Sequence, residues 1–282
     1  MRPERGSGPS AASTGTRERA LRARGGRPPW ILVLPALVGV AFLVLPMVGL
    51  LVRAPWSTLG GRLLQPQVLS ALWLSLSTAT VATGLCLLLG VPLAWSLART
   101  DFPGRRLVRA LVTVPLVMPP VVGGVALLLA LGRNGLLGRY LDAWFGITLP
   151  FTPAAVVLAQ VFVAMPFLVI SVEGALRGAD RRYEEAAATL GASRTAVFTR
   201  VTLPMVLPGI GAGAVLCWAR ALGEFGATIT FAGNFPGTTQ TMPLAVYVAM
   251  QRDPEAAIVL SLVLLLVCLA VLATLRERWT NV

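Results

Sequence analysis

The sequence predicts an all-α membrane protein with six transmembrane helices and with both termini on the cytoplasmic side of the membrane. Of its 282 residues, 56% are hydrophobic and only 13% are charged, and the mean hydropathy is +0.76. Soluble domains carry roughly 25% charged residues, so this composition is typical of a chain that lies largely in lipid. The apolar stretches and the placement of the arginines supply the rest of the prediction.

Six apolar stretches reach the length of about 20 residues that a helix needs to cross a bilayer. They are residues 30–52, 69–98, 107–131, 153–172, 205–231 and 256–275. Several of them contain proline, which membrane helices tolerate because neighbouring groups satisfy the freed backbone atoms. Each stretch is therefore predicted to be one transmembrane helix.

The basic residues set the predicted orientation. All 24 of them are arginine, and 18 lie in the N-terminal tail, the second-to-third and fourth-to-fifth connections and the C-terminus. Five lie on the opposite side, and Arg220 lies within a stretch. Since cytoplasmic loops carry the excess of basic residues, both termini and these two connections are predicted to be cytoplasmic.

The regions outside the main apolar part are assigned by composition. Residues 1–27 are rich in Arg, Gly and Ser and predict a disordered cytoplasmic tail. A signal peptide is the alternative, but the apolar run that follows is too long and has no convincing cleavage site. Residues 28–68 are then the first helix with its outer loop, 69–275 the main transmembrane domain, and 276–282 the cytoplasmic C-terminus.

Two residue types are missing from the chain, and their absence excludes most enzyme chemistry. Without lysine there is no P-loop and no Schiff-base nucleophile, and without histidine there is no Ser-His-Asp site or H-E-x-x-H zinc helix. Cys86, Cys217 and Cys268 lie far apart in apolar stretches and are interpreted as small buried hydrophobes. We therefore expect no enzyme activity, cofactor or metal in this chain. We also expect no nucleic-acid binding, because the arginines lie in short segments between long apolar runs.

The connection between the fourth and fifth stretches, residues 177–204, predicts two short helices joined by a turn. Asp180 is a good N-cap for the first helix, and two glutamates near its start suit the positive end of the helix dipole. Gly191 fits the end of that helix, and Ser193 fits the N-cap of the next. An ordinary connecting hairpin would have the same features.

The same connection resembles the EAA loop of ABC importer permeases, and we call it the EAA-like loop. Glu185-Ala-Ala is followed by three residues, Gly191, nine residues and Val201-x-Leu-Pro, with valine where isoleucine is commoner. In that family this loop contains the coupling helix, which docks in a groove of a separate ATP-hydrolysing subunit. The resemblance implies a type I importer architecture and a docking surface. The residues expected to form that surface are Glu184, Glu185, Ala186, Ala187, Gly191, Leu203 and Pro204.

A second motif is similar to the molybdate/tungstate branch of these permeases. It reads Arg220-Ala-Leu-Gly-Glu-Phe-Gly-Ala-Thr-Ile-Thr230 and continues to Asn234, and the run Pro115-Leu-Val-Met-Pro-Pro120 also resembles that branch. The likeness covers roughly residues 69–275. It implies import of molybdate or tungstate across a prokaryotic plasma membrane. A sulfate or thiosulfate permease of the same architecture is the alternative, whereas a membrane enzyme or a free-standing channel would not need the EAA-like loop.

The resemblance also implies partners for this chain. They are two copies of an ABC ATPase, which bind ATP and magnesium, a second copy of this permease, and an extracytoplasmic molybdate-binding protein, all working in the lipid bilayer. Because the chain has no P-loop, it is expected to be a non-catalytic subunit of an ATP-hydrolysing complex.

Two charged residues lie well inside the fifth stretch. Arg220 and Glu224 are four residues apart, so on a helix they share a face and form a pair that offsets their cost of roughly 2.5–3.5 kcal/mol each in the membrane. One interpretation is a structural ion pair. The other is a gate beside a passing dianion, for which the donor fork of arginine is suited. We favour the structural pair, with a secondary effect on the gate.

Neighbouring small and polar residues extend this candidate pathway. Gly223, Thr228, Thr230 and Asn234 are included because hydroxyl and amide groups offer neutral donors, although such groups more often bond to their own or to adjacent helices. Four glycines predict close packing of the fifth stretch against its neighbours. They are Gly209, Gly213, Gly223 and Gly226.

Overall fold

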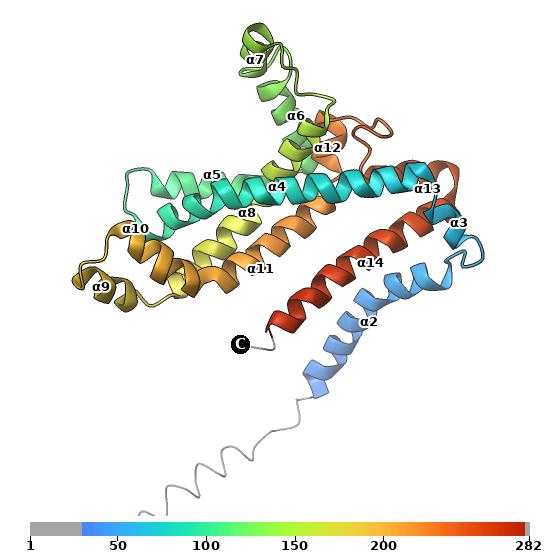
Figure 1. Ribbon diagram of the computed structural model, residues 1–282. Coiled ribbons are helices and arrows are strands. Elements are labelled where there is room, and N and C mark those ends of the chain that lie inside the picture. Colours follow the sequence, from blue (N-terminus) through green and yellow to red (C-terminus); the bar gives the residue numbers. More distant parts are fainter. Residues whose placement is uncertain (1–29, 280–282) are drawn as a thin grey trace, which may run out of the picture. The chain divides into compact units, whose positions relative to one another are not determined.

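The computed structural model describes residues 30–279, and the regular structure in that part of the chain is entirely helical (Figure 1). The predicted disordered tail at 1–27 lies outside the described residues, whereas the apolar run of the signal-peptide alternative is the described 23-residue helix Trp30–Val52. The helices are α2 (Trp30–Val52), α3 (Leu59–Leu63), α4 (Pro66–Arg99), α5 (Arg105–Val117), α6 (Pro120–Leu131), α7 (Gly138–Phe145), α8 (Pro153–Gly178), α9 (Arg182–Thr189), α10 (Arg194–Val197), a π-helical turn η1 (Phe198–Thr202), α11 (Leu203–Leu222), α12 (Gly226–Phe231), α13 (Met242–Arg252) and α14 (Pro254–Trp279).

Helix α2 belongs to a unit of its own, and its bounds match the first predicted stretch. It continues through Pro35 and Pro46, and none of its residues is buried. An apolar helix with no polar face is typical of a segment that is surrounded by lipid.

The second unit, from Arg53 onward, is built around three long helices. Helix α4 packs along α8, and α11 packs against both. A Cβ atom placed on Gly209 of α11 would lie 2.3 Å from Ala175 Cβ of α8, and one on Gly213 would lie 2.9 Å from Ser171 Cβ. The close packing predicted for these two glycines is confirmed, because only the missing side chains allow the backbones to approach this far.

The third predicted stretch, 107–131, is not a single helix. The chain forms α5 and α6 there, which are bent by 120° at the break between them. Met118 at the break has an extended backbone with ψ of 130°, as expected of a residue that precedes Pro119. Since Pro119 and Pro120 also lack backbone N–H donors, the helix cannot continue through this point without lost hydrogen bonds.

The fifth predicted stretch, 205–231, is also wrong as a single helix. Helix α11 begins at Leu203, directly after η1, and ends at Leu222, while α12 is separate. The three residues between them include Gly223, which is a poor helix former. Periodicity across 205–231 did not reveal this interruption, because the apolar composition continues through it.

Five helices of the described chain are long and apolar enough to cross a membrane, or six if the bent pair α5–α6 counts as one. This agrees with the six predicted stretches. The shorter helices α3, α7 and α13 were not predicted. Helix α14 extends to Trp279, so the predicted C-terminal segment 276–282 begins inside a helix.

Candidate functional site

The EAA-like loop folds as the predicted helical hairpin, at the opposite end of α4 from α3 (Figure 1). Gly191 has a φ of 85°, a left-handed conformation that glycine adopts without strain. Ser193 Oγ accepts the backbone N–H of Ala196 at 3.2 Å and so caps α10, as predicted. Asp180 Oδ1 accepts the N–H of Arg182 at 3.0 Å, although the residue that flanks α9 is Arg181.

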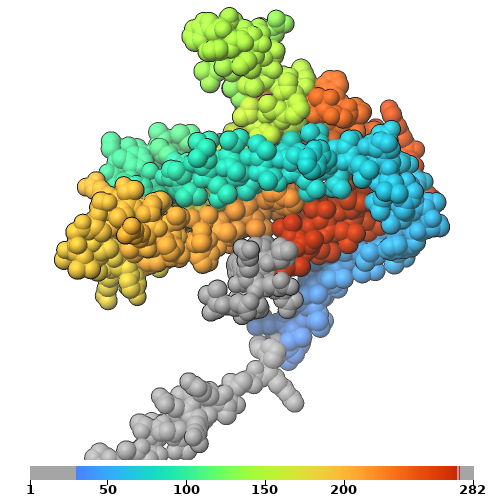
Figure 2. Space-filling view, in the orientation of Figure 1, coloured from blue at the N-terminus to red at the C-terminus, as the bar shows by residue number. Residues whose placement is uncertain are grey.

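The outward surface of this hairpin combines small, apolar and acidic residues. Glu185 and Ala186 are exposed and Ala187 is half-buried. Two large side chains that sequence analysis did not single out lie beside them, Tyr183 with 62% and Leu190 with 89% of their surface exposed. Figure 2 shows the hairpin, in yellow and gold, projecting at one end of this unit. Exposed aromatic and aliphatic groups next to small residues are typical of a protein-binding surface.

Glu184 lies differently from its neighbour Glu185. One of its carboxylate oxygens, Oε1, accepts a hydrogen bond from Arg99 Nη2 at 2.9 Å and another from Thr202 Oγ1 at 3.0 Å. The side chain of Arg99 is only 6% exposed. Glu184 is therefore directed toward α4 and η1 rather than toward the outward surface of the hairpin.

The remaining residues of the predicted docking set lead into the membrane-spanning core. Leu203 is half-buried and packs against the core of α4, α8 and α11, whereas Pro204 is exposed in the first turn of α11. Residues 194–222 form one continuous run of helix through α10, η1 and α11. A displacement of the hairpin would thus act directly on α11.

Arg220 and Glu224 form the predicted ion pair, with Arg220 Nη1 at 2.6 Å from Glu224 Oε2. The other oxygen, Oε1, accepts the backbone N–H of Ala227 at 2.7 Å. Glu224 is 1% exposed, whereas the Arg220 side chain is 28% exposed. The carboxylate therefore ties the last turn of α11 to the first turn of α12, while part of the guanidinium stays accessible.

The other candidate pathway residues are not brought together with this pair by any hydrogen bond. Thr230 Oγ1 donates to Gly226 O of its own helix at 2.8 Å, and Asn234 Oδ1 accepts from Gln240 Nε2 at 3.0 Å. Thr228 is fully buried, and its hydroxyl has no partner within the described residues. They remain predictions.

The two glycines that flank the break after α11 have different surroundings. A Cβ atom on Gly226 would lie 2.8 Å from Pro120 Cβ of α6, so close packing is confirmed there. A Cβ atom on Gly223 would have only Ala219 O nearby, at 3.6 Å. The close packing predicted for Gly223 is therefore wrong, and this position has room for a methyl group.

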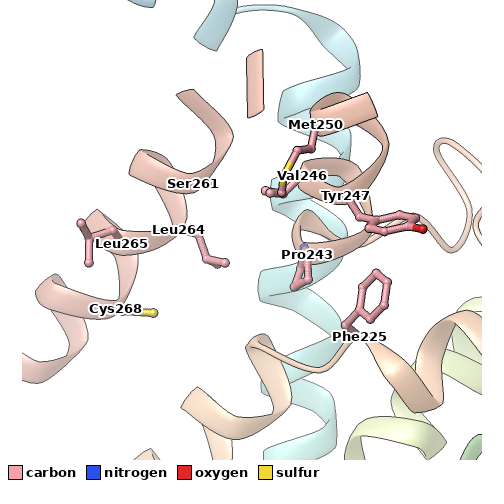
Figure 3. Close-up of a pocket in the computed structure, with 9 residues that line it drawn as sticks. All are labelled: Phe225, Pro243, Val246, Tyr247, Met250, Ser261, Leu264, Leu265 and Cys268. Carbon is pink, nitrogen blue, oxygen red and sulfur yellow. The ribbon is translucent and has the colours of Figure 1, made fainter. Parts of the chain in front are cut away.

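An apolar groove of about 500 Å³ lies next to this region (Figure 3). The ring of Phe225, the residue after Glu224, lies against that of Tyr247, with 5.2 Å between ring centroids. Met250 extends the same wall along α13, and α14 supplies the opposite wall. No charged side chain lines the groove, so it suits an apolar chain rather than an anion.

Metal binding finds no support in the described part of the chain. No three His, Cys, Asp or Glu side chains there lie close enough together to hold an ion. The carboxylates of the described residues that form ion pairs do so with arginines. Glu184 pairs with Arg99, Glu173 Oε1 pairs with both Arg109 and Arg177, and Arg62 pairs with both Asp253 and Glu255. Such clusters stabilise a fold or bind anions rather than cations.

Comparison with known proteins gives one family match and several close relatives. Residues 87–281 match the family model described as "Binding-protein-dependent transport system inner membrane component". The molybdenum transport system permease protein ModB of Mycobacterium tuberculosis is 51% identical, over 89% of this chain and 94% of that protein. The ModB protein of Escherichia coli is 44% identical, over 74% of this chain and 91% of that protein.

A sulfate permease and a solved transporter structure are more distant. The sulfate transport system permease protein CysT of Escherichia coli is 36% identical, over 84% of this chain and 88% of that protein. The structure of a bacterial alginate ABC transporter in complex with a pentasaccharide-bound periplasmic protein matches with a TM-score of 0.67 and 19% identity, over 93% of this chain and 94% of that chain. At this identity the structural match concerns the fold alone.

Proposed function

This chain belongs to the family of binding-protein-dependent transport system inner membrane components, and from that premise we propose that it is the membrane-spanning permease subunit of an ATP-driven molybdate importer. The observation that carries the proposal is 51% identity with a molybdenum permease over 94% of that protein's length. Tungstate is a tetrahedral dianion of similar size, so the proposed cargo includes it.

The EAA-like loop is the proposed dock of an ABC ATPase. The chain has no lysine and hence no P-loop, so ATP and magnesium bind to that partner, which hydrolyses the nucleotide. Two ATPase copies, a second copy of this permease and an extracytoplasmic binding protein complete the assembly. Glu185, Ala186 and Gly191 lie on the outward side or at the turn of the hairpin, which supports their assignment to the dock.

The path of the anion through the membrane is proposed to pass the C-terminal end of α11. Movement of the docked hairpin passes through η1 into α11, and the interruption at residues 223–225 lets α12 change its angle to α11. The Arg220–Glu224–Ala227 contacts hold these two helices together across the interruption. In this proposal the pair is primarily structural and has a secondary effect on the gate, because an arginine that is paired with Glu224 attracts a passing dianion less than an unpaired one would.

The orientation proposed from the arginines places both termini and the EAA-like loop in the cytoplasm. Cysteine labelling of a variant free of native cysteines tests it at two exposed positions, Ala192 in the hairpin and Thr238 between α12 and α13. A membrane-impermeant maleimide added to intact cells should label Thr238→Cys and not Ala192→Cys. Labelling of Ala192→Cys alone would reverse the orientation.

Uptake of labelled molybdate tests the function itself. The permease, its ATPase and its binding protein are reconstituted together, and uptake is measured with ATP, without ATP, and with unlabelled tungstate or sulfate as competitor. We expect uptake that depends on ATP and that is inhibited by tungstate but not by sulfate. Inhibition by sulfate alone would favour the sulfate permease alternative, for which the 36% identical relative is the supporting observation.

A further inference from the structure

The last turn of α4 holds the EAA-like loop through a buried charged side chain. Arg99 Nη2 donates to Glu184 Oε1 at 2.9 Å and also approaches Ala179 O at 3.5 Å. Thr202 Oγ1 donates to the same Glu184 oxygen at 3.0 Å. A single carboxylate oxygen therefore joins α4, α9 and η1, although Arg99 and Glu184 are 85 residues apart in sequence.

A second hydrogen bond joins the end of α4 to the EAA-like loop, and here the loop is the donor. Arg181, just before α9, donates from Nη2 to Ala98 O in the last turn of α4 at 3.2 Å. The carbonyl groups at the end of a helix lack intrahelical partners and carry partial negative charge, so an arginine there is stabilising. The loop donates to α4 through Arg181, and α4 donates to the loop through Arg99.

These contacts between α4 and the EAA-like loop affect how a movement of the hairpin reaches α11. Phe198–Thr202, between α10 and α11, is a π-helical turn, a rare form that occurs frequently at functional sites within α-helices. A push on the hairpin could be absorbed by distortion of this turn. The Thr202 hydroxyl at its end, held by Glu184 and through it by Arg99, opposes that distortion.

We propose that Arg99, Glu184 and Thr202 form a clamp that fixes the hairpin to α4 as well as to α11, so that the core of α4, α8 and α11 moves with the hairpin. Glu184 is then a positioning residue, and Glu185, its exposed neighbour, belongs to the docking surface. The inference rests on the proposed function, because it takes the hairpin to be the dock of an ABC ATPase.

The test uses the full permease–ATPase–binding-protein complex in proteoliposomes and compares two adjacent glutamates. Glu184→Gln removes the charge of the clamp, and Glu185→Gln makes the same change on the outward surface. For each variant we measure the amount of ATPase subunit that co-purifies, the rate of ATP hydrolysis, and anion transported per ATP hydrolysed. Asp101→Asn, at a 97% exposed carboxylate near the end of α4, is the control for a charge change at this end of the molecule.

Glu184→Gln leaves the buried guanidinium of Arg99 without its counter-ion, so a lower yield of folded protein is expected. The clamp predicts that the protein that does fold retains the ATPase subunit and its hydrolysis rate but transports less anion per ATP hydrolysed than the wild type. Glu185→Gln should instead reduce the amount of co-purified ATPase. Arg99→Met leaves a carboxylate uncompensated and is expected to lower the yield of folded protein. Arg99→Met combined with Glu184→Gln contains neither charge, so it should recover the yield while its transport per ATP stays low.

Two results would overturn the clamp. Loss of the ATPase subunit from Glu184→Gln, to the extent seen with Glu185→Gln, would make Glu184 part of the dock. A normal transport ratio in the double variant would mean that the contact transmits nothing. If the wild type transports sulfate in place of molybdate, the cargo proposal fails but the same ratio is measured with sulfate. If the wild type binds no ABC ATPase, the proposed function and the clamp fail together.

Discussion

Arg220 Nη1 lies 2.6 Å from Glu224 Oε2, although α11, which carries Arg220, ends between the two residues at Leu222. The pair is thus made across the end of a helix rather than along its face. Because the second carboxylate oxygen accepts the N–H of Ala227, Glu224 has both oxygens engaged while being 1% exposed. This geometry determines which substitutions separate the charge of Glu224 from its role as a hydrogen-bond acceptor for α12.

Substitutions at this pair should show whether the charges are needed for folding or for transport. Arg220→Leu leaves a buried carboxylate with one backbone donor and should destabilise the protein by roughly 3–5 kcal/mol. Arg220→Leu with Glu224→Gln removes both charges and keeps an acceptor for Ala227, so abundance and the thermal unfolding midpoint in detergent should recover. If the pair is structural, uptake recovers as well. Recovered abundance without uptake would assign Arg220 to the pathway, and a fully stable Arg220→Leu single variant would contradict the buried pair.

Two glycines on α11 provide a matched test of helix packing. A Cβ atom on Gly209 would lie 2.3 Å from Ala175 Cβ, whereas one on Gly211 meets nothing within 4 Å. Gly209→Ala should therefore push α8 and α11 apart and cost about 1–3 kcal/mol. Gly211→Ala should be neutral or stabilising by up to about 1 kcal/mol, because alanine is the better helix former. Thermal unfolding of both variants in the same detergent checks the difference, and equal midpoints would show that these helices are not in close contact.

The turn at Gly191 should tolerate substitution according to backbone conformation rather than size. Its φ is 85°, and a Cβ atom there would meet nothing within 4 Å. Asparagine adopts the left-handed conformation more readily than other residues with side chains, whereas valine is disfavoured by roughly 1–2 kcal/mol or more. Gly191→Asn should thus retain more co-purifying ATPase than Gly191→Val. An equal loss of the ATPase subunit in both variants would indicate that the available space at the dock, not the turn, requires glycine.

The ion pair between Arg62 of α3 and Asp253, the residue before α14, should make the stability of the protein depend on pH. A hydrogen bond from Arg62, followed by one from the Ala256 amide, lowers the pKa of Asp253 below its ordinary value of 3.8. A carboxylate whose pKa falls on folding contributes stability above its unfolded pKa and loses that contribution as the pH falls through the folded pKa. Asp253→Asn keeps an acceptor for Ala256 and removes the charge.

Wild type should therefore have a higher unfolding midpoint than Asp253→Asn at neutral pH, and the difference should shrink as the pH falls below 3.8. Unfolding in detergent at a series of pH values measures it. A difference that stays constant down to the most acidic pH at which the wild type remains folded would argue against the ion pair as its cause.

Helices and turns that depend on apolar length or on capping residues nearby in the sequence could be predicted from the sequence. Apolar length defined α2 to the residue, and capping residues and a glycine predicted the hairpin of α9 and α10. The interruptions in the third and fifth stretches were missed, because hydropathy continues through Met118 and through 223–225 while the backbone does not. Helix α13, with 11 residues, was too short to register as a span.

The sequence by itself determined that this chain is a multi-pass membrane protein with an EAA-like loop and a paired Arg220 and Glu224. These conclusions follow from composition, spacing and the chemistry of neighbouring residues. Only the tertiary structure decided that Glu184 is directed inward and Glu185 outward, since both stand in the first turn of the same helix. The physical reason is that the direction of Glu184 depends on Arg99, a buried charge 85 residues away, and local periodicity carries no information about such a contact.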